Sequence, residues 1–135
     1  MGLFGAMEIA GSGMTVHRKW LDAVSDNLAN INTARPTSGE AFRQRYIIAQ
    51  AVDYGSGQGG VTVGGVLYGD PQGRLVYNPE HPMADEGGYV RLPTINLGDQ
   101  MTQMIMAQRG YQANLATIER AQTAYQSALQ LGKNT

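Results

Sequence analysis

Two stretches of the chain decide the fold: residues 7–32 read MEIAGSGMTVHRKWLDAVSDNLANIN, and residues 97–132 read LGDQMTQMIMAQRGYQANLATIERAQTAYQSALQLG. In both, apolar side chains recur at steps of three and four residues, which places them on one face of an α-helix. Both stretches are poor in charge and rich in Ala, Asn, Gln, Thr and Ser. Helices with amides and methyl groups outside are typical of helices surrounded by protein, so assembly is predicted before catalysis.

The first stretch has a heptad pattern, with seam positions Met7, Ala10, Met14, His17, Leu21, Val24, Leu28 and Ile31. Gly11 and Gly13 each weaken its first turns by about 1 kcal/mol relative to Ala. The segment before Met14 is therefore expected to order only against partners. Asn tolerates a left-handed helix cap and Pro36 follows soon after, so the helix should end near residues 30–32.

The second stretch predicts a helix from about Leu97 to Leu131, which would be about 50 Å long. One heptad line in it contains Leu97, Met104, Tyr111, Ile118 and Tyr125. The other contains Met101, Gln108, Leu115, Gln122 and Leu129. Because this length exceeds the width of a compact domain of this size, the two terminal helices are expected to pair as a coiled coil.

The segment between the helices has β character. Short strands are predicted at residues 42–52, 61–68, 74–77 and 89–92, with a kink at Gly64–Gly65, a Gly/Ser loop at 53–60 and a turn at 78–88. The predicted fold class is therefore α+β, with long N- and C-terminal helices paired as a coiled coil and a small β-rich module between them.

Composition narrows the classes of function. Lys, Arg, Asp and Glu make up 16% of the 135 residues and the net charge is −1, so copies of the chain repel each other weakly. No basic run of five residues exists, which argues against nucleic-acid binding. The absence of cysteine excludes disulfides, thiol nucleophiles and zinc–thiolate sites. Neither a membrane-spanning helix nor a cleaved secretory signal is expected from the apolar runs.

Motifs that suggest chemistry have simpler explanations here. Residues 55–60 match G-x-G-x-x-G, but strand-forming residues follow where a dinucleotide site needs a helix, so a hairpin loop is favoured. His81, Asp85 and Glu86 suggest a metal or an acid pair, yet their segment is typical of a turn. His17 is read as a packed polar residue, with pH sensing as the alternative. No catalytic, cofactor-binding or metal-binding residue and no small-molecule substrate is predicted, so an enzyme is not expected.

Two further motifs carry a resemblance to a known family. Residues 25–33, SDNLANINT, are similar to the N-terminal signature of bacterial flagellar rod and hook proteins. Residues 107–115, AQRGYQANL, resemble the C-terminal helix motif of that family. Residues 74–96, RLVYNPEHPMADEGGYVRLPTIN, resemble the same region of a short basal-body rod member of the family. The length of the chain agrees with this, because the large inserted β domain of the distal rod and hook proteins is missing.

The resemblance implies a structural subunit of the proximal rod in the periplasmic part of the basal body. There it would self-assemble with other rod proteins into a hollow helical drive shaft that transmits torque. Implied partners are other rod proteins, the basal-body junction protein, copies of the chain and the type III export apparatus, which reads uncleaved segments. Residues 1–32 and 97–135 would form a helical inner, tube-forming domain, and residues 33–96 a small β-rich outer module with loops.

The expected assembly interface combines apolar helix positions with amides that set the register. The apolar members are Leu21, Leu28, Ile31, Met104, Tyr111, Leu115 and Ile118, and the amides are Asn27, Asn30, Asn32 and Asn114. For the Asn-rich turn, a simple helix cap remains open beside a specific interface turn. The competing functions are a free-standing helical coiled-coil adaptor or binding module, and another short rod protein of the same family.

A first prediction concerns Asn30. An unpaired buried amide costs about 1–3 kcal/mol, so Asn30→Leu is expected to impair assembly more than folding of the single chain. Electron microscopy of rods and denaturation of the isolated variant measure the two effects. Normal rods would show that this amide does not set the register.

Overall fold

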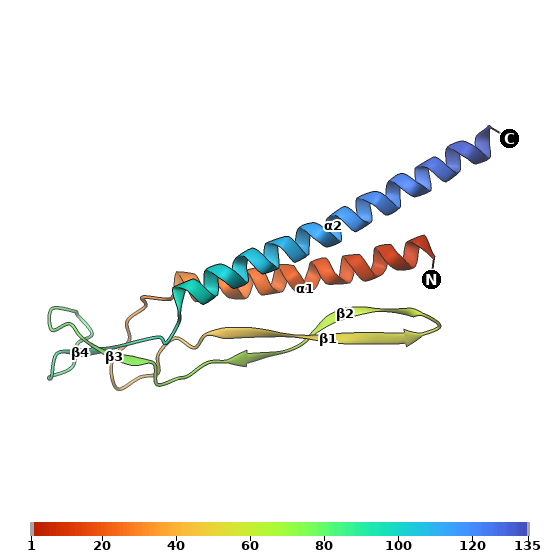
Figure 1. Ribbon diagram of the computed structural model, residues 1–135. Helices are drawn as coiled ribbons and strands as arrows, with labels where there is room; N and C mark the ends of the chain where they lie inside the picture. The colour runs from red at the N-terminus through yellow and green to blue at the C-terminus, as the bar shows by residue number, and fades with distance from the viewer. Residues whose placement is uncertain (1, 135) are drawn as a thin grey trace.

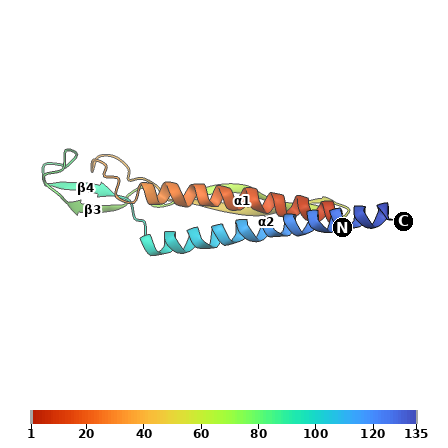
Figure 2. The same cartoon turned by 90° about the horizontal axis from the view of Figure 1, so that it is seen from above.

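The computed structural model describes residues 2–134 and confirms the α+β class. Its elements are α1 (Leu3–Ala29), β1 (Arg45–Gly55), β2 (Gln58–Tyr68), β3 (Arg74–Tyr77), β4 (Tyr89–Leu92) and α2 (Leu97–Lys133). The molecule is elongated, with α1 between α2 on one side and the β1–β2 hairpin on the other (Figures 1 and 2). The small β3–β4 hairpin forms a separate lobe at one end (Figure 1).

The two helices pack antiparallel along the length of α1. Trp20 Nε1 donates a hydrogen bond to Gln103 Oε1 at 3.2 Å. Near the other end, the rings of Phe4 and Tyr125 meet edge to face, with centroids 5.4 Å apart. At 1.5 Å per residue α1 is about 40 Å long and α2 about 55 Å, so the last turns of α2 extend past the start of α1 (Figure 1).

Two lines of side chains on α2 face α1 and form the seam, and only one of them is a predicted heptad line. Met104, Tyr111 and Ile118 are half-buried in it, as predicted. The other line of the seam is small or polar and was not predicted: it consists of Gln100, Ala107, Asn114 and Ala121. The predicted second line is exposed along its whole length and is not part of this seam. The alanines at these positions let the two helices approach closely.

The close approach of the two helices depends on a glycine from each of them. A Cβ added to Gly13 would lie 2.8 Å from the amide atoms of Asn114, and one added to Gly110 would overlap the His17 ring. His17 Nδ1 donates to the Gly13 carbonyl at 2.7 Å, which holds the ring over Gly110. His17 is therefore a packed polar residue of the seam, as predicted from its heptad position.

The helix α1 begins earlier than predicted and ends close to the predicted place, with Ala29 as its last residue. The helix begins at Leu3, so residues before Met14 are helical in spite of Gly11 and Gly13. Asn30 is the C-cap with φ −107°, so the helix ends without the left-handed residue that was expected. At the C-cap, the Asn30 backbone N–H makes the last helical hydrogen bond to the Asp26 carbonyl at 3.1 Å, and its side-chain Nδ2 donates to the same carbonyl at 2.9 Å.

The β1–β2 hairpin is longer than predicted because its turn is tight. Ser56 and Gly57 have φ of 56° and 76°, the positive values that a two-residue hairpin turn requires. The predicted loop at 53–60 is therefore wrong for most of its length. The predicted kink is confirmed, since the register shifts opposite Gly64, between Ile48 and Ala49.

The hairpin is attached to α1 through its backbone. Ser12 Oγ accepts a hydrogen bond from the Val61 N–H at 3.1 Å and donates to the Ile9 carbonyl at 2.7 Å. Gly60 lies so close that an added Cβ would be 2.5 Å from Ser12 Oγ. This contact places β2 alongside the first half of α1.

One buried amide joins all three layers. Asn27 is fully buried, and its Nδ2 donates to the Arg45 carbonyl and to Gln100 Oε1, both at 3.0 Å. Its Oδ1 accepts from the Arg45 N–H at 2.9 Å. Arg45 begins β1 and Gln100 lies in the first turn of α2, so Asn27 sets the position of both against α1.

Replacing this amide should destabilise the isolated chain strongly. Asn27→Ala leaves up to three buried polar groups unpaired, each at about 1–3 kcal/mol, so a loss of roughly 3 kcal/mol in the free energy of unfolding is expected. Chemical denaturation followed by circular dichroism measures it. Asn32→Ala is the control, because Asn32 is exposed and should change stability by less than about 0.5 kcal/mol. Equal effects would show that the Asn27 junction is not a centre of stability.

The glycine contact gives a second stability prediction. Gly110→Ala should destabilise the chain by about 1–3 kcal/mol through overlap with His17, although Ala is intrinsically the better helix former by about 1 kcal/mol. Gly11→Ala is the matched control: an added Cβ meets nothing within 4 Å there, so it should stabilise. Adding His17→Ala should remove most of the Gly110→Ala penalty. Thermal unfolding of these three variants and of the unmodified chain distinguishes overlap from a general effect of the substitution.

Candidate assembly interface

Large apolar side chains remain exposed on α2 after it has packed on α1. Met101, Leu115 and Leu129 are 49%, 38% and 49% exposed. Together with Gln108 and Gln122 they form the exposed row, which follows one heptad line of α2: Met101, Gln108, Leu115, Gln122 and Leu129. Isolated exposed apolar residues are ordinary, but a row of them along one helix marks an interaction surface.

The helix α2 carries few charged side chains. Its 37 residues contain five charged side chains: Asp99, Arg109, Glu119, Arg120 and Lys133. Asp99 and Lys133 lie in the first and last turns, where they complement the helix dipole. Over most of its length, α2 therefore presents methyl groups and amides to its surroundings.

The free ends of the helix pair are also uncovered. Residues 122–133 of α2 are all exposed, and Leu131 is 71% exposed. Phe4 at the start of α1 is 63% exposed although its ring touches Tyr125. The part of α2 that extends past α1 has no cover within residues 2–134.

The structure divides the predicted interface residues into two groups. Most lie inside the chain. Asn27 is fully buried, and the half-buried members are Leu21, Leu28, Asn30, Ile31, Met104, Tyr111, Asn114 and Ile118. Leu115 and Asn32 are exposed. The first group packs within the single chain, and only the second is open to a neighbour without rearrangement. Their part in assembly stays a prediction.

The four predicted amides have different partners. Asn27 forms the junction described above, and Asn114 Nδ2 donates to the Gly110 carbonyl of its own helix at 2.8 Å. Asn30 bonds locally, since its Oδ1 also accepts from Thr33 Oγ1 at 3.1 Å. The Asn-rich turn is therefore a helix cap at Asn30 and a link to the strand at Asn27. Part of any effect of Asn30→Leu will fall on the helix end itself.

Several residues that shape the helix pair were missed from the sequence. Gln100 is fully buried beside Asn27, and Trp20 bonds to Gln103. A usable signal for Gln100 existed, because it precedes Ala107, Asn114 and Ala121 at heptad spacing. This line was not predicted because its side chains are less hydrophobic than Met101, Leu115 and Leu129 in the neighbouring line.

The motifs that suggested chemistry have structural roles. Residues 55–60 form the end of the β1–β2 hairpin and continue into β2, not into a helix. Asp85 Oδ1 accepts from the Tyr89 N–H at 2.9 Å and its Oδ2 from Thr37 Oγ1 at 3.0 Å, so the predicted turn with side-chain caps is confirmed. Among residues 2–134, no three His, Asp or Glu side chains gather as a metal site.

The hydrogen bonds at Asp85 also affect its titration. The Tyr89 N–H, followed by the Thr37 hydroxyl and nearby backbone N–H groups, lowers the pKa of Asp85 below 3.8 against an opposing effect of burial. A lowered carboxyl pKa stabilises the fold above the ordinary value, and that stabilisation is lost as the pH falls through the lowered one. The turn at 78–88 is therefore fully capped at neutral pH.

Comparison with known proteins is consistent across the chain. Residues 7–37 match the family model for the flagella basal body rod protein, and residues 86–131 match that for the C-terminal part of the flagellar basal body rod FlgEFG proteins. The flagellar basal-body rod protein FlgC of Borreliella burgdorferi is 37% identical, covering 96% of this chain and 97% of its own. FlgC of Salmonella typhimurium is 33% identical over 98% and 100% of the two chains. FlgC of Aquifex aeolicus is 38% identical over 85% and 86%.

The two family models cover most of α1 and α2 and include β4, and the alignments with the relatives extend over 96–98% of the chain for the Borreliella and Salmonella proteins. In the part of the chain that the structure describes, no helix is both long and apolar enough to cross a bilayer. The chain belongs to the FlgC family of flagellar basal-body rod proteins and is a structural subunit of the basal-body rod.

Proposed function

We propose that this subunit builds the wall of the proximal rod, a hollow helical shaft that transmits torque through the periplasmic space. In this proposal residues 1–32 and 97–135 form the inner, tube-forming domain, and residues 33–96 form the outer module. The subunit reaches the rod through the flagellar type III export apparatus without a cleaved signal. It works without cofactor or substrate, as a structural protein and not as an enzyme.

The exposed row of α2 is the observation that carries the proposal. A helix that leaves Met101, Leu115 and Leu129 in water gains free energy when a neighbour covers them, at about 25 cal/mol per Å² of apolar surface. The row continues onto the part of α2 that α1 does not reach. Neighbouring rod subunits are the proposed cover.

The layering suggests an orientation for the subunit. One side of α1 is covered by α2 and another by the β1–β2 hairpin, while α2 contacts only α1 among the described helices and strands (Figure 2). The helix with the larger uncovered, charge-poor surface should lie deepest in the wall. We therefore infer that α2 faces inward and that the hairpin and the β3–β4 lobe face outward.

Several partners follow from this arrangement. Copies of the chain and other rod proteins would cover the exposed row and the free end of α2. The basal-body junction protein would meet the subunits at the end of the proximal rod. The relatives from Borreliella burgdorferi and Salmonella typhimurium support this proposal, because both are flagellar basal-body rod proteins.

A charge placed in the exposed row should block assembly and spare the fold. Leu115→Glu replaces an exposed side chain, so the free energy of unfolding of the isolated chain should change by no more than about 0.5 kcal/mol. In the rod the same carboxylate would be buried without a partner, at a cost of several kcal/mol. Soft-agar motility and electron microscopy of basal bodies, in a strain that makes only the variant, are expected to show loss of complete rods.

Ala113→Glu is the matched control for this experiment. Ala113 is exposed on the same helix, on the side that carries Arg109 and Arg120, and receives the same charge. It should retain most of the motility. Normal rods with Leu115→Glu would show that the row stays uncovered, which contradicts the proposal. The alternative, a free-standing coiled-coil adaptor, predicts that the isolated chain is stably helical and that a strain without the protein still builds normal flagella. Both results together would favour the adaptor.

A further inference from the structure

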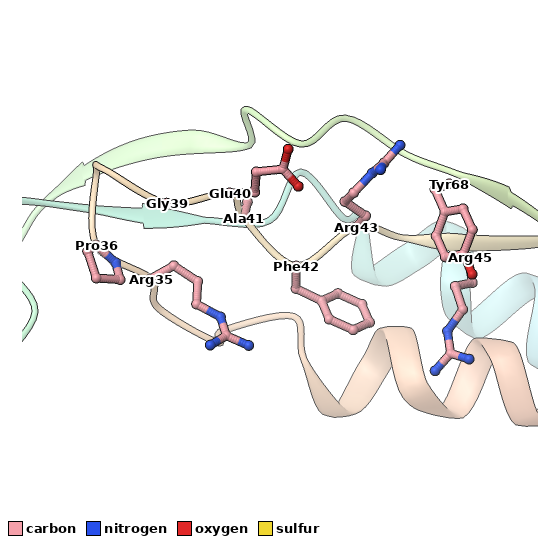
Figure 3. A pocket seen from close by; sticks show the side chains of 9 residues that line it. All are labelled: Arg35, Pro36, Gly39, Glu40, Ala41, Phe42, Arg43, Arg45 and Tyr68. Atoms are coloured by element: carbon pink, nitrogen blue, oxygen red, sulfur yellow. The ribbon is translucent and has the colours of Figure 1, made fainter.

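A hollow of about 560 Å³ lies where the connector between α1 and β1 passes the end of β2 (Figure 3). We call it the arginine hollow, and its charged and aromatic lining residues are Arg35, Glu40, Phe42, Arg43, Arg45 and Tyr68. The Glu40 side chain points to the opposite side of the connector from the Phe42 ring (Figure 3). Three guanidinium groups against one carboxylate, with two aromatic rings beside them, suit an acidic, partly apolar segment.

The cations of the hollow are incompletely used within the chain. The Arg35 side chain has no hydrogen-bond or ion-pair partner anywhere in residues 2–134, although its backbone pairs with Arg91. Arg45 pairs with Asp26 of α1, while Arg43 donates from Nε to the Gly69 carbonyl and lies over the Tyr68 ring. In Figure 3 the Arg35 and Arg45 side chains point to the same side of the connector as the Phe42 ring. An apolar ring therefore lies between two positive groups, one of them unpaired.

The complementary pattern occurs elsewhere in the same chain. The acidic loop, residues 78–88, reads NPEHPMADEGG and contains three acidic residues and no Lys or Arg. The Asp85 carboxylate already accepts hydrogen bonds within the turn. The exposed Glu80 and Glu86 have no side-chain partner among the described residues. Met83 lies between them in sequence and is 45% exposed. The loop forms the tip of the β3–β4 lobe (Figure 1).

We propose that the acidic loop of one copy docks into the arginine hollow of the next copy. The carboxylates of Glu80 and Glu86 would pair with guanidinium groups, which can bind a carboxylate through two parallel hydrogen bonds (bidentate binding). Met83 would lie against Phe42, since its flexible thioether adapts to aromatic surfaces. The inference rests on the proposed function only in that copies must be neighbours in the rod.

The geometry of this contact has a consequence for assembly. The loop and the hollow are different surfaces, so the contact is head-to-tail and can be repeated from copy to copy. Repeated contacts of this kind close into a ring or continue as a helix. A contact between the outer lobes would thus set the spacing of subunits around the rod, while the helices pack within its wall.

Cysteine cross-linking tests the proposal directly, because the chain has no cysteine of its own. Two differently tagged full-length copies, one with Met83→Cys and one with Phe42→Cys, are produced together in a strain without the unmodified protein. Mild oxidation of isolated basal bodies should yield a cross-linked pair that carries both tags. Because Phe42 is half-buried, Tyr68→Cys, at a 56% exposed position, provides a second partner for Met83→Cys.

A charge exchange then tests the chemistry of the contact. Arg35→Glu should lower the mixed cross-link roughly fivefold, as should Glu80→Arg combined with Glu86→Arg. Placing the opposite reversals on the two copies should restore it. Arg74→Glu is the control, since this exposed arginine lies on β3 and does not line the hollow.

The remaining outcomes separate this contact from the proposed function. Assembled rods without a mixed cross-link, or with pairs of the Phe42→Cys copy alone, would overturn the docking and leave the rod subunit in place. A Met83→Cys link to a different rod protein would replace the second copy by that partner and also overturn the proposal. Absence of rods with the unmodified chain would overturn both.

Discussion

The rest of the structure depends on the close approach of three backbones at Asn27. This amide has no contact with water and uses its donors and its acceptor on Arg45 and Gln100. A hydrophobic residue at that position would pack, but it would leave the Arg45 peptide groups and Gln100 unpaired. The hydrogen bonds therefore set the register in which the hairpin and the second helix lie on the first. Gly13 and Gly110 hold that register along the seam, because only glycine leaves room for Asn114 and His17.

The chain uses its apolar residues unusually. Its seam is narrow and contains amides, glycines and alanines, whereas several of its largest aliphatic side chains remain in water along α2. A stable monomer would reverse this distribution. In the proposed rod the distribution would be consistent, because the close seam keeps each subunit slender and the exposed row would be left for neighbours. The low charge of α2 fits the same proposal, since buried charges need partners.

The two regions of the chain have different interaction chemistry. The helices present methyl groups and amides, which pack well but discriminate weakly between partners. The connector and the β3–β4 lobe carry unpaired charges of opposite sign on two surfaces, at Arg35 and at Glu80 and Glu86. Charged contacts add specificity and orientation more than affinity. A division of labour follows, in which the helices would supply cohesion and the outer region the choice of neighbour.

The two terminal helices, the short strands at residues 74–77 and 89–92, the kink at Gly64 and the family could all be predicted from the amino-acid sequence. These features depend on periodicity, turn chemistry and motifs, which are local properties of the chain. Only the tertiary structure decided which line of α2 faces α1, how tight the hairpin turn is, and what Asn27 binds. These choices depend on backbone approach and on partners far apart in sequence, such as Asn27 and Gln100, which are 73 positions apart. Periodicity shows that a helix has an apolar face, but close packing decides whether that face turns toward the chain or toward its neighbours.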